Sequence, residues 1–246
     1  MIPLRDNIPS RTFPVVNTVL ILANVGAFLY ELSLGSAGAQ QLIEQFGIVP
    51  RSFLNSFGAT EIATVYSSMF LHAGWAHLLS NMLALYIFGD NVEDRMGKVG
   101  YLIFYLLGGT LAGLAQIYSD QGSIIPMIGA SGAIAAVLGA YIVLYPRARV
   151  LTVIPIWVIP FFIELYAGVY LGIWFLTQLL SGTAAIVARS SQTEGGVAFW
   201  AHASGFVAGL ALVKVFARSV RRSRTNRVGV TCEQHAQIAS SIDRLR

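Results

Sequence analysis

Residues 71–88 read LHAGWAHLLSNMLALYIF, and this stretch decides which class of fold the chain can adopt. It carries no charged side chain and comes close to the roughly 20 apolar residues that a helix needs to cross a bilayer. His77 and Asn81 are four residues apart within it and therefore share one helix face. Polar groups inside a membrane segment are costly and indicate function. The stretch therefore predicts a membrane helix with a polar site on one face.

The composition of the whole chain supports a membrane protein. Of its 246 residues, 55% are hydrophobic and only 11% are charged, whereas about a quarter of the residues in a soluble domain are charged. This excludes a disordered chain and an ordinary soluble enzyme. The single cysteine, Cys232, excludes a disulfide framework, a cysteine-based zinc site and an iron–sulfur cluster.

Five more stretches have a comparable apolar length. Pro155 and Pro160 interrupt the fifth of the six, so we expect residues 152–162 to be irregular or interfacial. Its helix is then expected to begin near Ile163, with Glu164 at the N-terminal end, where a carboxylate is favoured. The loop 32–64 is long enough to hold structure of its own. We predict an all-α membrane protein whose six transmembrane helices cover residues 13–30, 71–88, 99–117, 128–145, part of 151–187, and 199–216.

The basic residues predict how this bundle is oriented. Of the 16 Lys and Arg, all except Arg51 and Arg189 fall on the side that holds both termini, and such an excess marks the cytoplasmic side. We therefore expect both termini to be cytoplasmic. The chain divides into a cytoplasmic N-terminal segment (1–12), a six-span domain (13–216) and a basic cytoplasmic tail (217–246). Its compact size suits a multi-pass protein of a prokaryotic plasma membrane.

The basic tail accounts for much of the net charge of +4. Its arginines follow the last span directly, where a basic cluster attracts anionic lipid headgroups. No aromatic platform for stacking bases accompanies the cluster. Membrane lipids, and not nucleic acid, are therefore the expected partner of the tail.

Three of the predicted spans place polar groups at one depth. His77, Ser131 and His202 lie roughly 20, 24 and 18 Å from the cytoplasmic boundary, counted at about 1.5 Å per helical residue. The core is about 30 Å thick, so this layer lies somewhat below the outer surface. Three helices that carry their rare polar groups at one level predict a shared site.

The residue types in this layer point to acyl transfer. A serine hydroxyl becomes nucleophilic when a histidine takes its proton, so Ser131 is the candidate nucleophile and His202 the candidate base. No Asp or Glu lies at matching depth in the sixth span or its neighbours, which predicts a Ser–His dyad without a carboxylate. The candidate oxyanion pocket contains Asn81, His77 and Gly129, with the backbone N–H of Ser131 at a helix N-terminus. This chemistry requires no cofactor and no metal.

The three motifs together resemble the rhomboid family of intramembrane serine proteases. They are an Asn four residues after a His on the second span, GASG at residues 129–132, and AHASG at residues 201–205. The resemblance covers about residues 13–216. It implies that Ser131 and His202 form the catalytic dyad, that His77 and Asn81 line the oxyanion pocket, and that transmembrane protein substrates are cleaved near their outer end.

One position departs from the family pattern. Some members carry an aromatic residue one turn after the serine that stacks on the catalytic histidine, whereas this chain has Ala135. The resemblance therefore predicts that other packing holds His202. Because a helical peptide bond is shielded, we also expect a preference for small and helix-weakening residues around the cleaved bond.

Other functions compete with proteolysis. The GASG motif alone is weak, because small residues and serine commonly pack membrane helices. One alternative is a non-catalytic rhomboid-like protein that binds client helices on the same scaffold, but a pseudoenzyme would be expected to lack the serine or the histidine. A small transporter or haem carrier, with His77 and His202 as proton or metal sites, is a further alternative.

Overall fold

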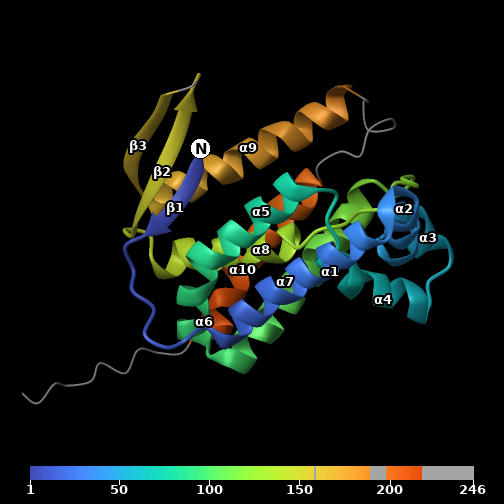
Figure 1. Ribbon diagram of the computed structural model, residues 1–246, viewed down its shortest axis with the longest axis horizontal. Helices are drawn as coiled ribbons and strands as arrows, with labels where there is room; N and C mark the ends of the chain where they lie inside the picture. The colour runs from blue at the N-terminus through green and yellow to red at the C-terminus, as the bar shows by residue number, and fades with distance from the viewer. Residues whose placement is uncertain (158, 189–197, 218–246) are drawn as a thin grey trace, which may run out of the picture.

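The computed structural model describes residues 1–157, 159–188 and 198–217, which form a bundle of helices with a small sheet at one side (Figure 1). Among these residues, three helices are long and apolar enough to cross a membrane: α1 (Val15–Ser33), α7 (Lys98–Ser119) and α10 (Phe199–Phe216). The other predicted spans also contain helices, namely α5 (Trp75–Ala84), α8 (Ser131–Leu144) and α9 (Ala167–Ala188). The chain is therefore mostly helical.

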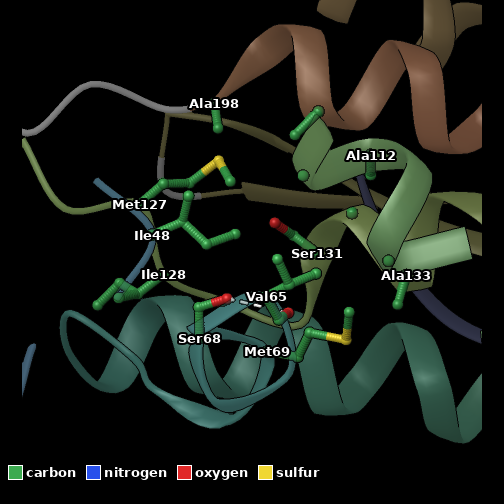
Figure 2. Close-up of a pocket in the computed structure, with 15 residues that line it drawn as sticks. Ile48, Val65, Ser68, Met69, Ala112, Met127, Ile128, Ser131, Ala133 and Ala198 are labelled. Atoms are coloured by element: carbon green, nitrogen blue, oxygen red, sulfur yellow. Dashed lines mark hydrogen bonds between the residues drawn. The ribbon is translucent and has the colours of Figure 1, made fainter. Parts of the chain in front are cut away.

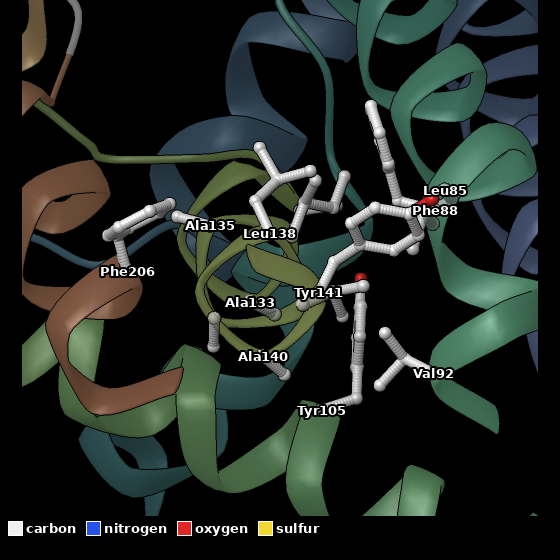
Figure 3. Close-up of a cluster of buried hydrophobic side chains, with 14 of the residues drawn as sticks. Leu85, Phe88, Val92, Tyr105, Ala133, Ala135, Leu138, Ala140, Tyr141 and Phe206 are labelled. Atoms are coloured by element: carbon white, nitrogen blue, oxygen red, sulfur yellow. The ribbon is translucent and has the colours of Figure 1, made fainter. Parts of the chain in front are cut away.

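Helix α8 lies at the centre of the bundle. Every residue from Gly132 to Tyr141 is buried, as expected for a helix that is apolar on all sides. Its neighbours are α7, α10 and the π-helical turn η2 (Leu85–Gly89), which continues α5 into α6 (Asp90–Met96). Figure 3 shows the side chains of α8 within this core, beside Leu85, Phe88, Val92, Tyr105 and Phe206.

The long loop after α1 is structured, as predicted. It folds into α2 (Gly35–Phe46), α3 (Pro50–Asn55) and α4 (Ala59–Ser67), followed by the short 3-10 helix η1 (Ser68–Phe70). Ile48 exchanges two backbone hydrogen bonds of 3.0 and 2.7 Å with Met127, which lies just before α8. This pairing fixes the loop beside the N-terminal end of α8.

The prediction of an all-α fold is wrong in one part, because the chain also forms a three-stranded antiparallel sheet. Its order is β1 (Ile2–Asp6), β2 (Arg149–Ile156) and β3 (Ile159–Tyr166). Within the stretch expected to be irregular, residues 152–156 and 159–162 are therefore regular strands. The many β-branched and aromatic residues favour this structure, and the two prolines face each other across the hairpin. β1 lies within residues 1–12, which we had assigned to a separate N-terminal segment.

The sheet also changes the start of the fifth helix. α9 begins at Ala167 and not near Ile163. Glu164 does not lie at a helix N-terminus. It belongs to β3, where its carboxylate accepts a hydrogen bond from the Arg149 guanidinium at 3.3 Å. Both side chains are more than half exposed, so this ion pair contributes little to stability.

A cluster of carboxyl groups ties β1 to the bundle. The Asp6 carboxylate accepts hydrogen bonds from the Tyr141 hydroxyl and, at 3.3 Å, from the Asn91 amide. Burial raises the pKa of Asp6. Burial also raises the pKa of Asp90 to about 6, against hydrogen bonds from Asn91 that lower it, and the negative charges of Asp6 and Asp94 raise it further.

We predict that Asp90→Asn stabilises the protein at pH 7 but not at pH 4. The pKa of Asp90 is higher in the folded chain than its ordinary 3.8, so the folded state binds more protons between about pH 4 and 6, and the free energy of unfolding falls as the pH rises through this window. Asparagine removes the buried charge but keeps the oxygen that accepts from Asn91. Thermal unfolding in detergent should show a higher Tm for the variant at pH 7 and equal values at pH 4.

The exposed Glu44→Gln provides the control and should leave the Tm unchanged at both pH values. An Asp90→Asn variant that is equally destabilised at both pH values would contradict the prediction.

Candidate active site

The structure brings Ser131 and His202 into direct contact. Ser131 is the first residue of α8 and His202 lies in the first turn of α10. The distance from Ser131 Oγ to His202 Nε2 is 2.7 Å, although the residues are 71 positions apart in the sequence. On the other side of the ring, His202 Nδ1 lies 2.8 Å from Gln178 Oε1. Because an amide oxygen only accepts, Nδ1 carries the proton and Nε2 accepts from the serine hydroxyl.

Glycines allow α8 and α10 to approach until their backbones touch. A Cβ atom on Gly209 would lie 2.0 Å from the carbonyl oxygen of Ala136, and one on Gly205 would lie 2.3 Å from that of Gly132. Both distances are far below van der Waals contact. The small-residue spacing seen in the sequence therefore lies at the helix–helix contact that joins the serine to the histidine.

Helix α7 holds the beginning of α10. The side-chain oxygen of Gln116 accepts a hydrogen bond of 3.1 Å from the backbone N–H of Ala201. This N–H is one of the first few in α10, which have no partner within the helix. The contact fixes the backbone next to His202.

Sequence reasoning missed the two residues of α9 that hold the ring of His202. Gln178 contacts Nδ1, and the ring of Trp174 lies 6.0 Å from the imidazole with a tilt of 33°. They are four residues apart, hence on one face of α9. Ala135, which stands where some family members carry an aromatic residue, is fully buried. Its Cβ would lie only 3.2 Å from a Cβ on Gly205, so an aromatic ring would not fit there. The sequence did contain one signal for Gln178, namely a polar glutamine inside a predicted membrane span.

His77 and Gly129 lie together beside the serine. If Gly129 carried a Cβ atom, that atom would lie 2.7 Å from the ring of His77 and 3.7 Å from Ser131 Oγ. Gly129 has a φ of +121°, a conformation that residues with a Cβ rarely adopt. Its N–H donates to the carbonyl of Ser68 at 2.8 Å. Gly129 therefore lines the site, while its amide is occupied elsewhere.

Asn81 is buried and is held by His72. The side-chain nitrogen of Asn81 lies 3.0 Å from His72 Nε2. The rings of His72 and His77 meet edge to face at 4.9 Å, so the three polar side chains are contiguous. The backbone N–H of His72 donates to the Glu31 carboxylate at 3.2 Å. His72 itself is almost completely buried and supports Asn81.

A small cavity of about 30 Å³ opens next to Ser131. Figure 2 shows the serine side chain on its wall, together with apolar side chains from the loop before α8 and from the segment between α2 and η1. The space is small, so the cavity suits a small group of a substrate. Its lining includes Ile48, Val65, Met69, Met127 and Ala201.

Comparisons with known proteins place this chain in a family. The profile of the Rhomboid domain matches residues 59–219, well over half of the chain. The chain is 31% identical over 145 residues to RHOMBOID-like protein 12, mitochondrial, of Arabidopsis thaliana, and 35% identical over 130 residues to the rhomboid protease GluP of Bacillus subtilis. Each match covers 52% of this chain, but only 41% and 24% of those two proteins.

We predict that Gly209→Ala destabilises the protein by forcing α8 and α10 apart. Overpacking of a tight contact typically costs about 1–3 kcal/mol, so the Tm in detergent should fall by several degrees. Gly172→Ala is the matched control, because it lies within α9 and its Cβ would meet no atom within 4 Å. That variant should be neutral or slightly more stable, since alanine favours helices. Equal Tm values for the two variants would argue against a close helix contact.

Proposed function

We propose that this chain, which belongs to the rhomboid family, is an intramembrane serine endopeptidase that cleaves transmembrane protein substrates near the outer membrane face. The observation that carries the proposal is the 2.7 Å contact between Ser131 Oγ and His202 Nε2, made by residues from two different helices. One of the relatives is itself named a rhomboid protease. Its name supports proteolysis as the chemistry of this contact.

In the proposed mechanism, His202 takes the proton of the Ser131 hydroxyl as the oxygen attacks the carbonyl carbon of the substrate. The resulting oxyanion accepts hydrogen bonds from the side chains of His77 and Asn81 and from the backbone N–H of Ser131. His202 then gives its proton to the leaving amine. A water molecule, deprotonated by the same imidazole, hydrolyses the acyl-enzyme and releases the serine.

Gln178 serves in this mechanism as a positioning residue. It accepts the Nδ1 proton of His202, so the lone pair of Nε2 faces the serine hydroxyl. This is the role of the aspartate in a Ser–His–Asp triad, here filled by a neutral amide. A neutral group suits a site among membrane helices, where an unpaired carboxylate is costly.

The membrane arrangement belongs to the proposal. We infer six spans with both termini in the cytoplasm, because α5, α8 and α9 occupy the predicted spans that accompany α1, α7 and α10. The proposal includes a multi-pass protein of a prokaryotic plasma membrane, which the compact size of the chain suits. Residues 218–246 of the predicted lipid-binding tail lie outside the described residues.

The cavity beside Ser131 supports a preference for a small side chain at the cleaved bond. Its small volume of about 30 Å³ favours a small side chain over a large one. A small side chain is also easily accommodated when the substrate helix unwinds. The preference for small residues expected from the sequence is thus part of the proposed specificity.

Two other functions fit the geometry less well. A non-catalytic binder of client helices needs no hydroxyl aligned with a correctly protonated imidazole. A haem or metal site on His202 needs a free ring nitrogen, whereas Nε2 contacts Ser131 and Nδ1 contacts Gln178.

We predict that a fluorophosphonate probe labels the wild-type protein in membranes and that Ser131→Ala abolishes labelling. His202→Ala should slow labelling about 10²- to 10⁴-fold, the usual contribution of a general base. Ser204→Ala is the matched control. This serine lies in α10, as His202 does, but its hydroxyl donates to the carbonyl of Trp200. That variant should label normally. Persistent labelling of Ser131→Ala, read on a gel, would overturn the assignment.

We predict that Gln178→Leu lowers kcat about 10- to 100-fold with little change in KM or Tm, because loss of the acceptor lets the imidazole turn away from the serine. Gln178→Glu keeps an acceptor oxygen at the same place and should retain more of the activity. Both are measured with a transmembrane substrate reconstituted in vesicles. A purely structural role would instead lower the Tm of both variants together.

A further inference from the structure

The hairpin formed by β2 and β3 exposes large apolar side chains at its tip. Trp157 is 96% exposed, Phe162 61%, Ile159 58% and Phe161 47%. The sequence contains no charged residue from Val150 to Ile163. A concentration of exposed aromatic and branched side chains marks an interaction surface.

The tip is apolar on both faces of the hairpin. Phe161 and Phe162 are consecutive in β3, so their side chains point to opposite faces, and both are exposed. At the base, in contrast, Val150 is fully buried and joins the core of the bundle. The base is thus anchored in the protein, while the tip needs an environment that surrounds it. A protein partner docking on one face would leave the other uncovered, whereas lipid covers both.

The hairpin connects two of the proposed membrane helices. α8 ends at Leu144, shortly before β2, and α9 begins directly after β3. Figure 1 shows the hairpin and α9 leaving the same end of the bundle. The base of the hairpin therefore lies beside the start of α9, and its tip projects away from the axis of that helix.

Charged groups lie only at the base of the hairpin. Arg147 and Arg149 are exposed there, and Arg5 of β1 lies close to Arg149 and Glu164 around a shared surface pocket. Basic residues beside an aromatic tip are typical of a segment at the membrane–water interface, where Trp settles among the headgroups and Arg binds lipid phosphates.

The backbone limits how deep the tip can lie. β3 is the outer strand of the sheet, so the polar groups on its free edge have no strand partner and need water or headgroups. Pro155 and Pro160 face each other near the tip, and neither has an N–H, so this pair leaves no donor unsatisfied. Both features favour the interface over the hydrocarbon centre.

We propose that the β2–β3 hairpin is an interfacial membrane anchor whose tip, with Trp157, Phe161 and Phe162, is inserted at the boundary between headgroups and acyl chains. The occupant of this surface is the lipid bilayer. The inference rests on the membrane placement of α8 and α9 within the proposed function, and it is independent of the catalytic chemistry.

The test places spin labels on the full-length chain in nanodiscs of phosphatidylcholine and phosphatidylglycerol. A Cys232→Ser background removes the only native cysteine. Trp157→Cys and Phe162→Cys then report on the tip, and Pro9→Cys reports on an exposed site outside the sheet. Collisions with oxygen, which concentrates in lipid, are compared with collisions with a water-soluble nickel chelate. Labels at 157 and 162 should collide several-fold more with oxygen than with nickel, and the label at 9 should show the reverse.

Two results would overturn the anchor. Nickel collisions at 157 and 162 equal to those at 9 would place the tip in water. Protection from both reagents would place it against protein, and spin–spin broadening that vanishes on dilution with unlabelled chain would identify a second copy as the partner. Fluorophosphonate labelling of the same samples reports on Ser131 separately, so a failure of the anchor and a failure of the proposed catalysis are distinguishable.

Discussion

The site depends on the direct contact between the backbones of α8 and α10. Ser131 and His202 each lie at the beginning of their helix, so the distance between the two helices sets the distance from hydroxyl to imidazole. A methyl group on Gly205 or Gly209 would collide with a carbonyl oxygen of α8. In a membrane, where lipid tails are as apolar as leucine, such close packing is itself a main source of helix association. The same glycines therefore stabilise the bundle and align the two reactive groups.

Three further helices restrain the histidine and the oxyanion pocket from outside this contact. α7 fixes the first turn of α10 through Gln116, and α9 supplies Trp174 and Gln178 to the imidazole. On the opposite side, α1 reaches the pocket through Glu31, which binds the backbone of His72. The ring of His202, the N–H of His72 and the N–H of Ala201 are each held by another element, in keeping with the rule that buried polar groups form hydrogen bonds. The site is consequently a property of the whole bundle and not of one motif.

The sequence predicted those features that depend on local pattern. Apolar length located the helices, and counting residues from flanking charges placed Ser131 and His202 at one level, which the hydrogen bond between them matches. Which helices lie side by side was not predictable in this way. Spacing shows that Gln178 and Trp174 share a face of α9, but not which helix that face meets. The hairpin was missed because its prolines were interpreted as helix breakers in a membrane stretch, although valine, isoleucine and phenylalanine equally favour strands.

For the proposed hydrolysis, the position of the site at helix ends resolves a conflict between the reaction and the membrane. Hydrolysis requires hydrogen-bond donors and water, whereas the interior of a bundle has no place for unsatisfied donors. The first N–H groups of a helix lack partners within it in any case, and α8 begins at Ser131 itself. Gly129, with its positive φ, turns the chain so that these groups adjoin His77 and the cavity. The donors that an oxyanion needs are thus the ones that the fold already leaves free, and little additional polar surface has to be buried to provide them.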